Sequence, residues 1–145
     1  SQRKHAMEHI QSHAIDIGVG TCEPKDIDHS GIVKATLMAM RKAVDSLSVT
    51  VDFLLVDYLE IPDLPSHGVL HGDRVCFSIA SASIVAKVAR DKLMKDMDLI
   101  YPNYGFAKHK GYPTRHHIKN LALLGPSPIH RLSFKPVRQY LKVSV

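Results

Sequence analysis

The chain has 145 residues, 45% of them hydrophobic, so it is long enough for one domain with a hydrophobic core and too short to expect two. No apolar run approaches the roughly eighteen residues of a membrane span, and the N-terminal SQRKHAMEHI lacks the apolar core of a signal peptide. These features predict a soluble, cytoplasmic protein. Cys22 and Cys76 have neither metal-site spacing nor a disulfide framework, so we expect both to be reduced and to serve packing.

The charge of the chain is divided unevenly. All 14 acidic residues lie in residues 1–98 beside 11 lysines and arginines, a net −3, whereas residues 99–145 hold 8 basic residues and no acidic one, a net +8. A basic segment on an acidic body indicates a polyanionic partner, most commonly nucleic acid. A basic surface that serves only solubility is the alternative.

The first half of the chain alternates expected helices and strands. Residues 1–13 can form a helix, and "IDIGVGTC" (15–22) has the alternation of a strand. We expect a loop over 23–31 and a helix that runs to Leu47 with Ser30 as its N-cap. "VDFLLVD" (51–57) is a short apolar run, typical of a strand in a sheet covered on both faces.

The second half contains one long helix. We expect a loop over 58–68, where prolines and glycine recur, and a further short strand over 69–73. Residues 78–100 form the long amphipathic helix, and residues 115–124 form another with Thr114 as N-cap. The last twenty residues, rich in proline and basic side chains, are expected to be extended. The pattern predicts a single α/β domain over 1–145.

Two aspartates are candidates for a metal site. Asp57 ends the apolar strand, where open α/β sheets place their sites, and Asp73 follows a second apolar segment just before the long helix. Two carboxylates that meet at one edge repel each other unless a cation joins them, and oxygen ligands select Mg²⁺ or Mn²⁺. The alternative is that Asp57 begins an ordinary loop and Asp73 caps a turn.

Histidines suggest a second metal hypothesis. His5, His9 and His13 recur every four residues, and "HAMEH" fits the H-x-x-E-H pattern of inverted zinc proteases. The stretch is short, and no sequence pattern of a strand or a cleft lies beside it. We therefore favour the interpretation that these histidines form a solvated face of a helix. The adjacent His116 and His117 point to different sides of any helix, which makes them poor partners for one metal.

Four stretches in the same order carry a family resemblance. They are "FLLVDYLEIPDLP", "HGDRVCFSIASASIVAKVARDKLM", "YPNYGFAKHKGYPT" and "GPSPIHRLSFKPV". Together they resemble the C-terminal two-thirds of ribonuclease HII, the type 2 ribonuclease H, and "DIGVGTCEPKDIDHSGIVKATLMAMRKAV" upstream is similar to that family too.

The resemblance implies a ribonuclease H-like α/β fold, a mixed sheet flanked by helices. It also implies a metal-dependent endoribonuclease that cleaves the RNA strand of RNA/DNA hybrids and incises duplex DNA 5′ of single ribonucleotides, leaving a 3′-hydroxyl. Such enzymes use four carboxylates with Mg²⁺ or Mn²⁺. Their partners are RNA/DNA hybrids and ribonucleotide-containing duplex DNA, with no membrane and no obligate protein partner.

The resemblance also implies roles for individual residues of this chain that stand in the family's motifs. Asp57 in "LLVDY" and Asp73 in "HGD" match two of the catalytic, metal-binding carboxylates. Tyr112 in "HKGYPT" matches the tyrosine that packs against the deoxyribose beside the RNA/DNA junction. Three basic side chains near it are expected to hold substrate phosphates: Lys108, Lys110 and Arg115.

The sequence also departs from the family pattern. An Asp-Glu pair followed by Gly-Arg-Gly, which supplies two further carboxylates and reads the 2′-hydroxyl, is not in these 145 residues. Tyr58 stands where the family has Gly, and His71 where it has Lys. We therefore expect an N-terminally truncated copy that lacks the first strands and is inactive or weakly active alone. A non-catalytic nucleic-acid-binding fragment or degenerate paralogue is the alternative.

Overall fold

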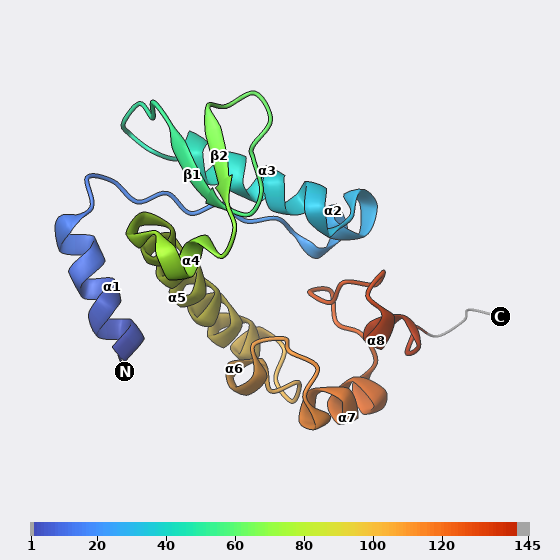
Figure 1. The fold of residues 1–145 in the computed structure, drawn as a ribbon. Helices are drawn as coiled ribbons and strands as arrows, with labels where there is room; N and C mark the ends of the chain where they lie inside the picture. Colours follow the sequence, from blue (N-terminus) through green and yellow to red (C-terminus); the bar gives the residue numbers. More distant parts are fainter. Residues whose placement is uncertain (1, 142–145) are drawn as a thin grey trace. The chain divides into compact units, whose positions relative to one another are not determined.

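The computed structural model describes residues 2–141 (Figure 1). The chain divides into two compact units, residues 1–21 with 36–89 and residues 22–35 with 90–145, which are taken in turn below. Helices α3 (Ile32–Asp45) and α5 (Phe77–Ile100) contribute residues to both units. No helix among the described residues is long and apolar enough to cross a membrane.

The first unit contains the sheet. Strand β1 (Leu54–Asp57) runs parallel to β2 (Ser66–Val69), with Asp57 opposite Val69. The unit also contains α1 (Gln2–His13) and the short α4 (Gly72–Val75). Its buried apolar side chains are Val56, Ile61, Ile79 and Val85.

Three strand predictions need correction. Residues 15–22 form no strand: a Cβ on Gly18 would lie 2.1 Å from the Ala43 carbonyl oxygen, so the small residues serve close packing on α3. The strand expected over 69–73 lies instead at 66–69, and His71 leaves the strand conformation with a φ of 54°. β1 is not covered on both faces, because Leu55 is 48% exposed.

The second unit begins with a helix where a loop was expected. Helix α2 (Pro24–Ser30) starts with Pro24 at its first turn, and the Asp26 carboxylate accepts a hydrogen bond from the Glu23 amide at 3.1 Å. Ser30 is therefore the last residue of α2. It is not the N-cap of α3, because α3 begins only after Gly31. Gly31 has a φ of 80° and so separates the two helices.

The rest of the second unit packs around aromatic residues. Met94, Tyr104 and Phe106 form a buried cluster against which Met97 and Ile129 pack. Helices α6 (Phe106–His109) and α7 (Arg115–Leu124) follow, and the Thr114 hydroxyl accepts from the His117 amide as predicted. Residues 126–141 are not simply extended, because Lys135–Arg138 forms the short helix α8 with Pro136 in its first turn. The remaining residues of that predicted extended segment, 142–145, lie outside the described part of the chain.

Candidate functional site

The carboxylate of Asp57 lies at the carboxyl end of β1. The preceding residue, Val56, is buried and anchors the strand, while Asp57 itself is exposed. Asp57 Oδ1 accepts a hydrogen bond from the backbone amide of Gly72 at 2.9 Å. The side chain is thereby fixed toward the turn that begins α4.

Gly72 allows this approach and brings Asp73 next to Asp57. Gly72 is buried, and a Cβ there would lie 2.5 Å from Ile79 Cδ1 and 3.4 Å from Asp57 Oδ1. Asp73, the next residue, is exposed in the first turn of α4. The Gly of "HGD" is therefore needed for close packing, and the bond from Gly72 links Asp57 to the residue before Asp73. A shared metal site of the two aspartates stays a prediction.

Neither aspartate is engaged in an ion pair within residues 2–141, so both keep oxygen atoms for a ligand. The described residues contain no group of three or more histidine, cysteine or acidic side chains that could hold a metal ion. His5, His9 and His13 on α1 are all exposed, which fits the solvated face and not the zinc-protease pattern.

The basic residues and Tyr112 lie together in the second unit. Lys108 is exposed in α6, Arg115 is exposed at the first position of α7, and Tyr112 lies between these helices in the sequence with its side chain 65% exposed. The backbone between them is held by the Tyr112 amide, which donates to the His109 carbonyl at 2.8 Å. An exposed aromatic residue thus stands in the sequence between two exposed basic residues.

Lys110 differs from its neighbours. It is half-buried, and its ammonium group donates to the Ala107 carbonyl. Its own carbonyl accepts a hydrogen bond from Arg90 Nη2 at 2.9 Å. Gly111 has a φ of 84°, and a Cβ there would lie 3.2 Å from Arg90 Nη2, so this position requires glycine. Sequence reasoning missed Arg90, because a basic residue on an amphipathic helix carries no local signal.

Three histidines of the second unit form a buried cluster, which sequence reasoning also missed. His109, His117 and His130 are each at most 6% exposed. The rings of His109 and His117 stack with centroids 4.0 Å apart, and His117 Nε2 lies 3.0 Å from His130 Nε2. His116 is exposed, which confirms that the adjacent His116 and His117 point to different sides of the helix.

Burial controls the protonation of two of these rings. Burial, followed by the nearby His117, lowers the pKa of His130 to about 4. Burial also lowers the pKa of His109, although its hydrogen bond with the Tyr104 carbonyl acts in the opposite direction. Both rings are therefore neutral at pH 7.

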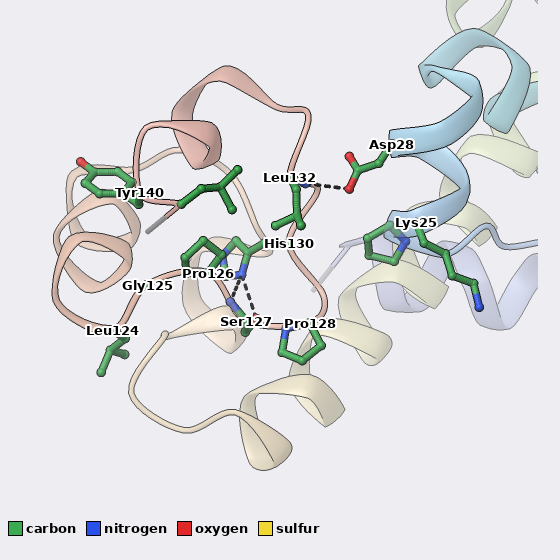
Figure 2. A pocket seen from close by; sticks show the side chains of 12 residues that line it. Lys25, Asp28, Leu124, Gly125, Pro126, Ser127, Pro128, His130, Leu132 and Tyr140 are labelled. Carbon is green, nitrogen blue, oxygen red and sulfur yellow. Dashed lines mark hydrogen bonds between the residues drawn. The ribbon is translucent and has the colours of Figure 1, made fainter. Parts of the chain in front are cut away.

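A surface pocket of the second unit lies away from the predicted site residues. It is lined by residues of α2 and of the segment after α7, among them Asp28, Pro126 and Tyr140 (Figure 2). Asp28 accepts hydrogen bonds from the Leu132 and Ser133 amides at 2.8 and 2.9 Å. Burial acts to raise the pKa of Asp28, but these bonds and the Ser133 hydroxyl outweigh it and lower the pKa. Asp28 in the pocket wall therefore has a structural role, because it holds the segment at Leu132 and Ser133 to α2.

Asp57 and Asp73 therefore belong to one unit, and Tyr112, Lys108, Lys110 and Arg115 belong to the other. The union of these groups in one site stays a prediction. So does the single domain over 1–145.

Comparison with known proteins identifies the family. The family model described as Ribonuclease HII matches residues 4–137, nearly the whole chain. The chain belongs to the ribonuclease HII family. The sequence-based assignment is confirmed, and with it membership of a family of ribonucleases.

Two curated relatives show how much of the family protein is represented. The chain is 50% identical to Ribonuclease HII from Desulfitobacterium hafniense over 145 residues, which are 99% of this chain and 56% of that protein. It is 50% identical to Ribonuclease HII from Dehalococcoides mccartyi over 140 residues, 95% of this chain and 66% of that protein. The chain thus spans less than two-thirds of the length of these relatives.

A solved structure confirms the fold. The crystal structure of the ribonuclease H2 from Pyrococcus horikoshii OT3 is similar with a TM-score of 0.80 at 20% identity, over 96% of this chain and 74% of the other. The ribonuclease H-like α/β class expected from the sequence is therefore correct.

Proposed function

We propose that this chain supplies part of the active site of a divalent-metal-dependent endoribonuclease. Its substrates are the RNA strand of RNA/DNA hybrids and duplex DNA with single embedded ribonucleotides, cut on the 5′ side to leave a 3′-hydroxyl. Membership of the family supports the reaction class, and the link from Asp57 to Gly72 supports the placement of the catalytic carboxylates.

The two aspartates fit a hard divalent cation. Carboxylates are suitable ligands for Mg²⁺ or Mn²⁺, and Mg²⁺ is commonly held by one or two carboxylates together with water and substrate phosphates. Asp57, with one oxygen fixed by the Gly72 amide, and the adjacent Asp73 are the residues of this chain that would hold the metal. When bound, such a cation activates water and stabilises the leaving 3′-oxygen.

The chain's own residues contribute by positioning the substrate and by supplying positive charge for its phosphates. Lys108 and Arg115 bind phosphates without reading sequence, since both are exposed and cationic. The Lys110 ammonium is also bonded to Ala107, so it contributes to phosphate binding through its remaining donors. Tyr112 offers its ring to a sugar that lacks a 2′-hydroxyl, the group by which RNA differs from DNA.

We propose further that these 145 residues alone cleave weakly or not at all, because they lack the Asp-Glu and Gly-Arg-Gly motif. A non-catalytic nucleic-acid-binding module is the second candidate. It is favoured by the absence of a three-ligand group among the described residues and by the net charge of +8 in residues 99–145.

The two candidates are separated by a cleavage assay with Mn²⁺ or Mg²⁺ on a DNA duplex that carries one ribonucleotide. The 145-residue chain and the protein as its gene encodes it are tested in parallel, each with Asp57→Asn. Asp63→Asn is the matched control, because Asp63 is exposed in a loop with a φ of 63° that asparagine adopts readily. We expect metal-dependent cleavage that Asp57→Asn abolishes and Asp63→Asn preserves; salt-sensitive binding without cleavage in every sample would favour the binding module.

A further inference from the structure

A chain of hydrogen bonds leads from Ser127 to the backbone of Tyr112. The Ser127 amide donates to His130 Nδ1 at 2.9 Å, His130 Nε2 meets His117 Nε2 at 3.0 Å, and His117 Nδ1 meets the Tyr112 carbonyl at 2.9 Å. All these groups lie in the second unit. The contacts of His130 with the Ser127 amide and with His117 are buried, so each needs one donor and one acceptor.

The donor and the acceptor of each hydrogen bond in this network can be assigned from the groups at its two ends. An amide N–H can only donate, so His130 Nδ1 is unprotonated and its Nε2 carries the proton of the neutral ring. His117 Nε2 must then accept, which places the His117 proton on Nδ1, facing the Tyr112 carbonyl. The neighbouring His109 is fixed likewise, because its Nδ1 accepts from the Gly111 amide at 3.1 Å and its Nε2 donates to the Tyr104 carbonyl at 2.8 Å.

The segment that this network supports carries the exposed ring of Tyr112. The Tyr112 carbonyl accepts both from His117 and from the Thr114 amide, at 2.9 and 2.8 Å. Gly111 on one side is tied to His109, and Thr114 on the other side caps α7. The backbone on both sides of Tyr112 is therefore bonded, while its side chain is 65% exposed.

We infer that His117 is a positioning residue, whose Nδ1–H fixes the Tyr112 backbone and so sets the exposed ring for the substrate sugar. His130 acts through His117 by fixing its tautomer. The inference rests on the proposed role of Tyr112 in substrate binding and adds to it the residues that preorganise the ring. His117 itself makes no contact with substrate in this arrangement, since it is buried.

Proton uptake by His130 would break this chain. A proton on His130 Nδ1 would face the Ser127 amide and place two donors together. The other titratable groups near the network are His116, whose ring lies 6.2 Å from that of His109, Asp98 of α5, which acts on His109, and Tyr104.

Two substitutions at His117 separate positioning from packing. His117→Asn keeps an N–H donor near the position of Nδ1, whereas His117→Phe keeps a ring and removes the donor. His116→Asn is the matched control on the exposed side of the same helix. Binding of a DNA duplex with one ribonucleotide is measured in EDTA at pH 8 with the full chain.

At pH 8 we expect His117→Asn and His116→Asn to bind within about threefold of the unsubstituted chain, and His117→Phe to bind at least about tenfold more weakly. If His117→Phe fails to fold, the imidazole tautomers described below decide. Equal binding by all variants, or equal weakening of His117→Asn and His117→Phe, would overturn the inference.

Imidazole ¹⁵N NMR tests the network independently of binding. We expect the proton on Nδ1 in His117 and on Nε2 in His109 and His130. A His117 ring protonated on Nε2 alone overturns the inference whatever the binding results. The expected tautomers in a chain that shows no preference for the ribonucleotide duplex would instead count against the proposed function.

Discussion

Asp57 Oδ1 and the backbone amide of Gly72 are joined by a hydrogen bond of 2.9 Å, which ties the end of β1 to the start of α4. Fifteen residues separate the two partners in the sequence, and the bond brings Asp57 beside the residue that precedes Asp73. The geometry depends on the absence of a side chain at position 72.

The first prediction concerns this glycine. Gly72→Ala places a Cβ 2.5 Å from Ile79 Cδ1, and overpacking of this kind costs about 1–3 kcal/mol of unfolding free energy. Because the displaced turn carries Asp73, we expect cleavage to fall more than the stability loss explains, by about tenfold or more at a temperature where the variant is folded. Denaturant unfolding and cleavage rates measure both effects.

Gly31→Ala is the control for that experiment. Its φ of 80° and ψ of 161° make alanine strained, by about 1–3 kcal/mol, but nothing lies within 4 Å of the added Cβ. It should be destabilised to a similar degree and keep its cleavage rate when folded. A Gly72→Ala protein as active as Gly31→Ala would show that the turn does not position a catalytic carboxylate.

Tyr112 gives the second prediction. Because its side chain is 65% exposed, Tyr112→Ala should leave stability nearly unchanged. Loss of the ring contact should weaken binding of a ribonucleotide-containing duplex by about 1–3 kcal/mol, roughly 5- to 150-fold. Tyr112→Phe keeps the ring and should bind nearly normally in a fluorescence titration. If Tyr112→Phe bound the duplex as weakly as Tyr112→Ala, the role would belong to the hydroxyl group instead of the ring.

The third prediction is the salt dependence of binding. If Lys108 and Arg115 each contact a phosphate, replacing either with alanine lowers the slope of log K against log salt by about 0.9. Lys4, exposed on α1, is the control lysine whose loss should leave the slope unchanged. Titrations at several salt concentrations give the slopes; identical slopes for Lys108→Ala and Lys4→Ala would remove Lys108 from the phosphate-binding set.

The fourth prediction follows from the low pKa of His130. A histidine whose pKa falls from its ordinary value of 6.5 to about 4 on folding binds protons more readily in the unfolded chain. Its contribution to stability is therefore complete above about pH 6.5 and is lost as the pH falls toward 4, by at most about 3 kcal/mol.

His130→Gln tests that prediction. Glutamine keeps a donor toward His117 Nε2 and does not titrate. In urea unfolding between pH 7 and pH 4, the variant should lose less stability than the unsubstituted chain. Asp28, whose pKa is below its ordinary 3.8, weakens the fold only at still lower pH, so the two effects separate. If the unfolding free energies of His130→Gln and of the unsubstituted chain fell in parallel with pH, the low pKa assigned to His130 would be contradicted.

The parts predicted correctly from the sequence rest on local signals. Helix α5 has a long amphipathic pattern, and α7 has Thr114 as its cap, so both were found with nearly correct ends. Asp57 was found because a carboxylate that ends an apolar run is a local feature. Helix α2 was missed, because seven residues rich in charge carry little periodicity.

The missed parts depend on tertiary contacts. The glycines of 15–22 imitate strand alternation but pack against α3, a contact that only the fold specifies. His109, His117 and His130 lie eight and thirteen positions apart, a spacing that fits no helix face or metal motif. Their assembly results from the meeting of α6, α7 and the turn at Ser127, so no local pattern could reveal it.

The most direct test of the central claim is product mapping on a duplex DNA with one ribonucleotide and Mn²⁺ or Mg²⁺, using the protein as its gene encodes it. We predict a single cut on the 5′ side of the ribonucleotide with a 3′-hydroxyl product, present with Asp63→Asn and lost with Asp57→Asn or on addition of EDTA. A cut that persists in Asp57→Asn, or a product without the 3′-hydroxyl, would contradict the account.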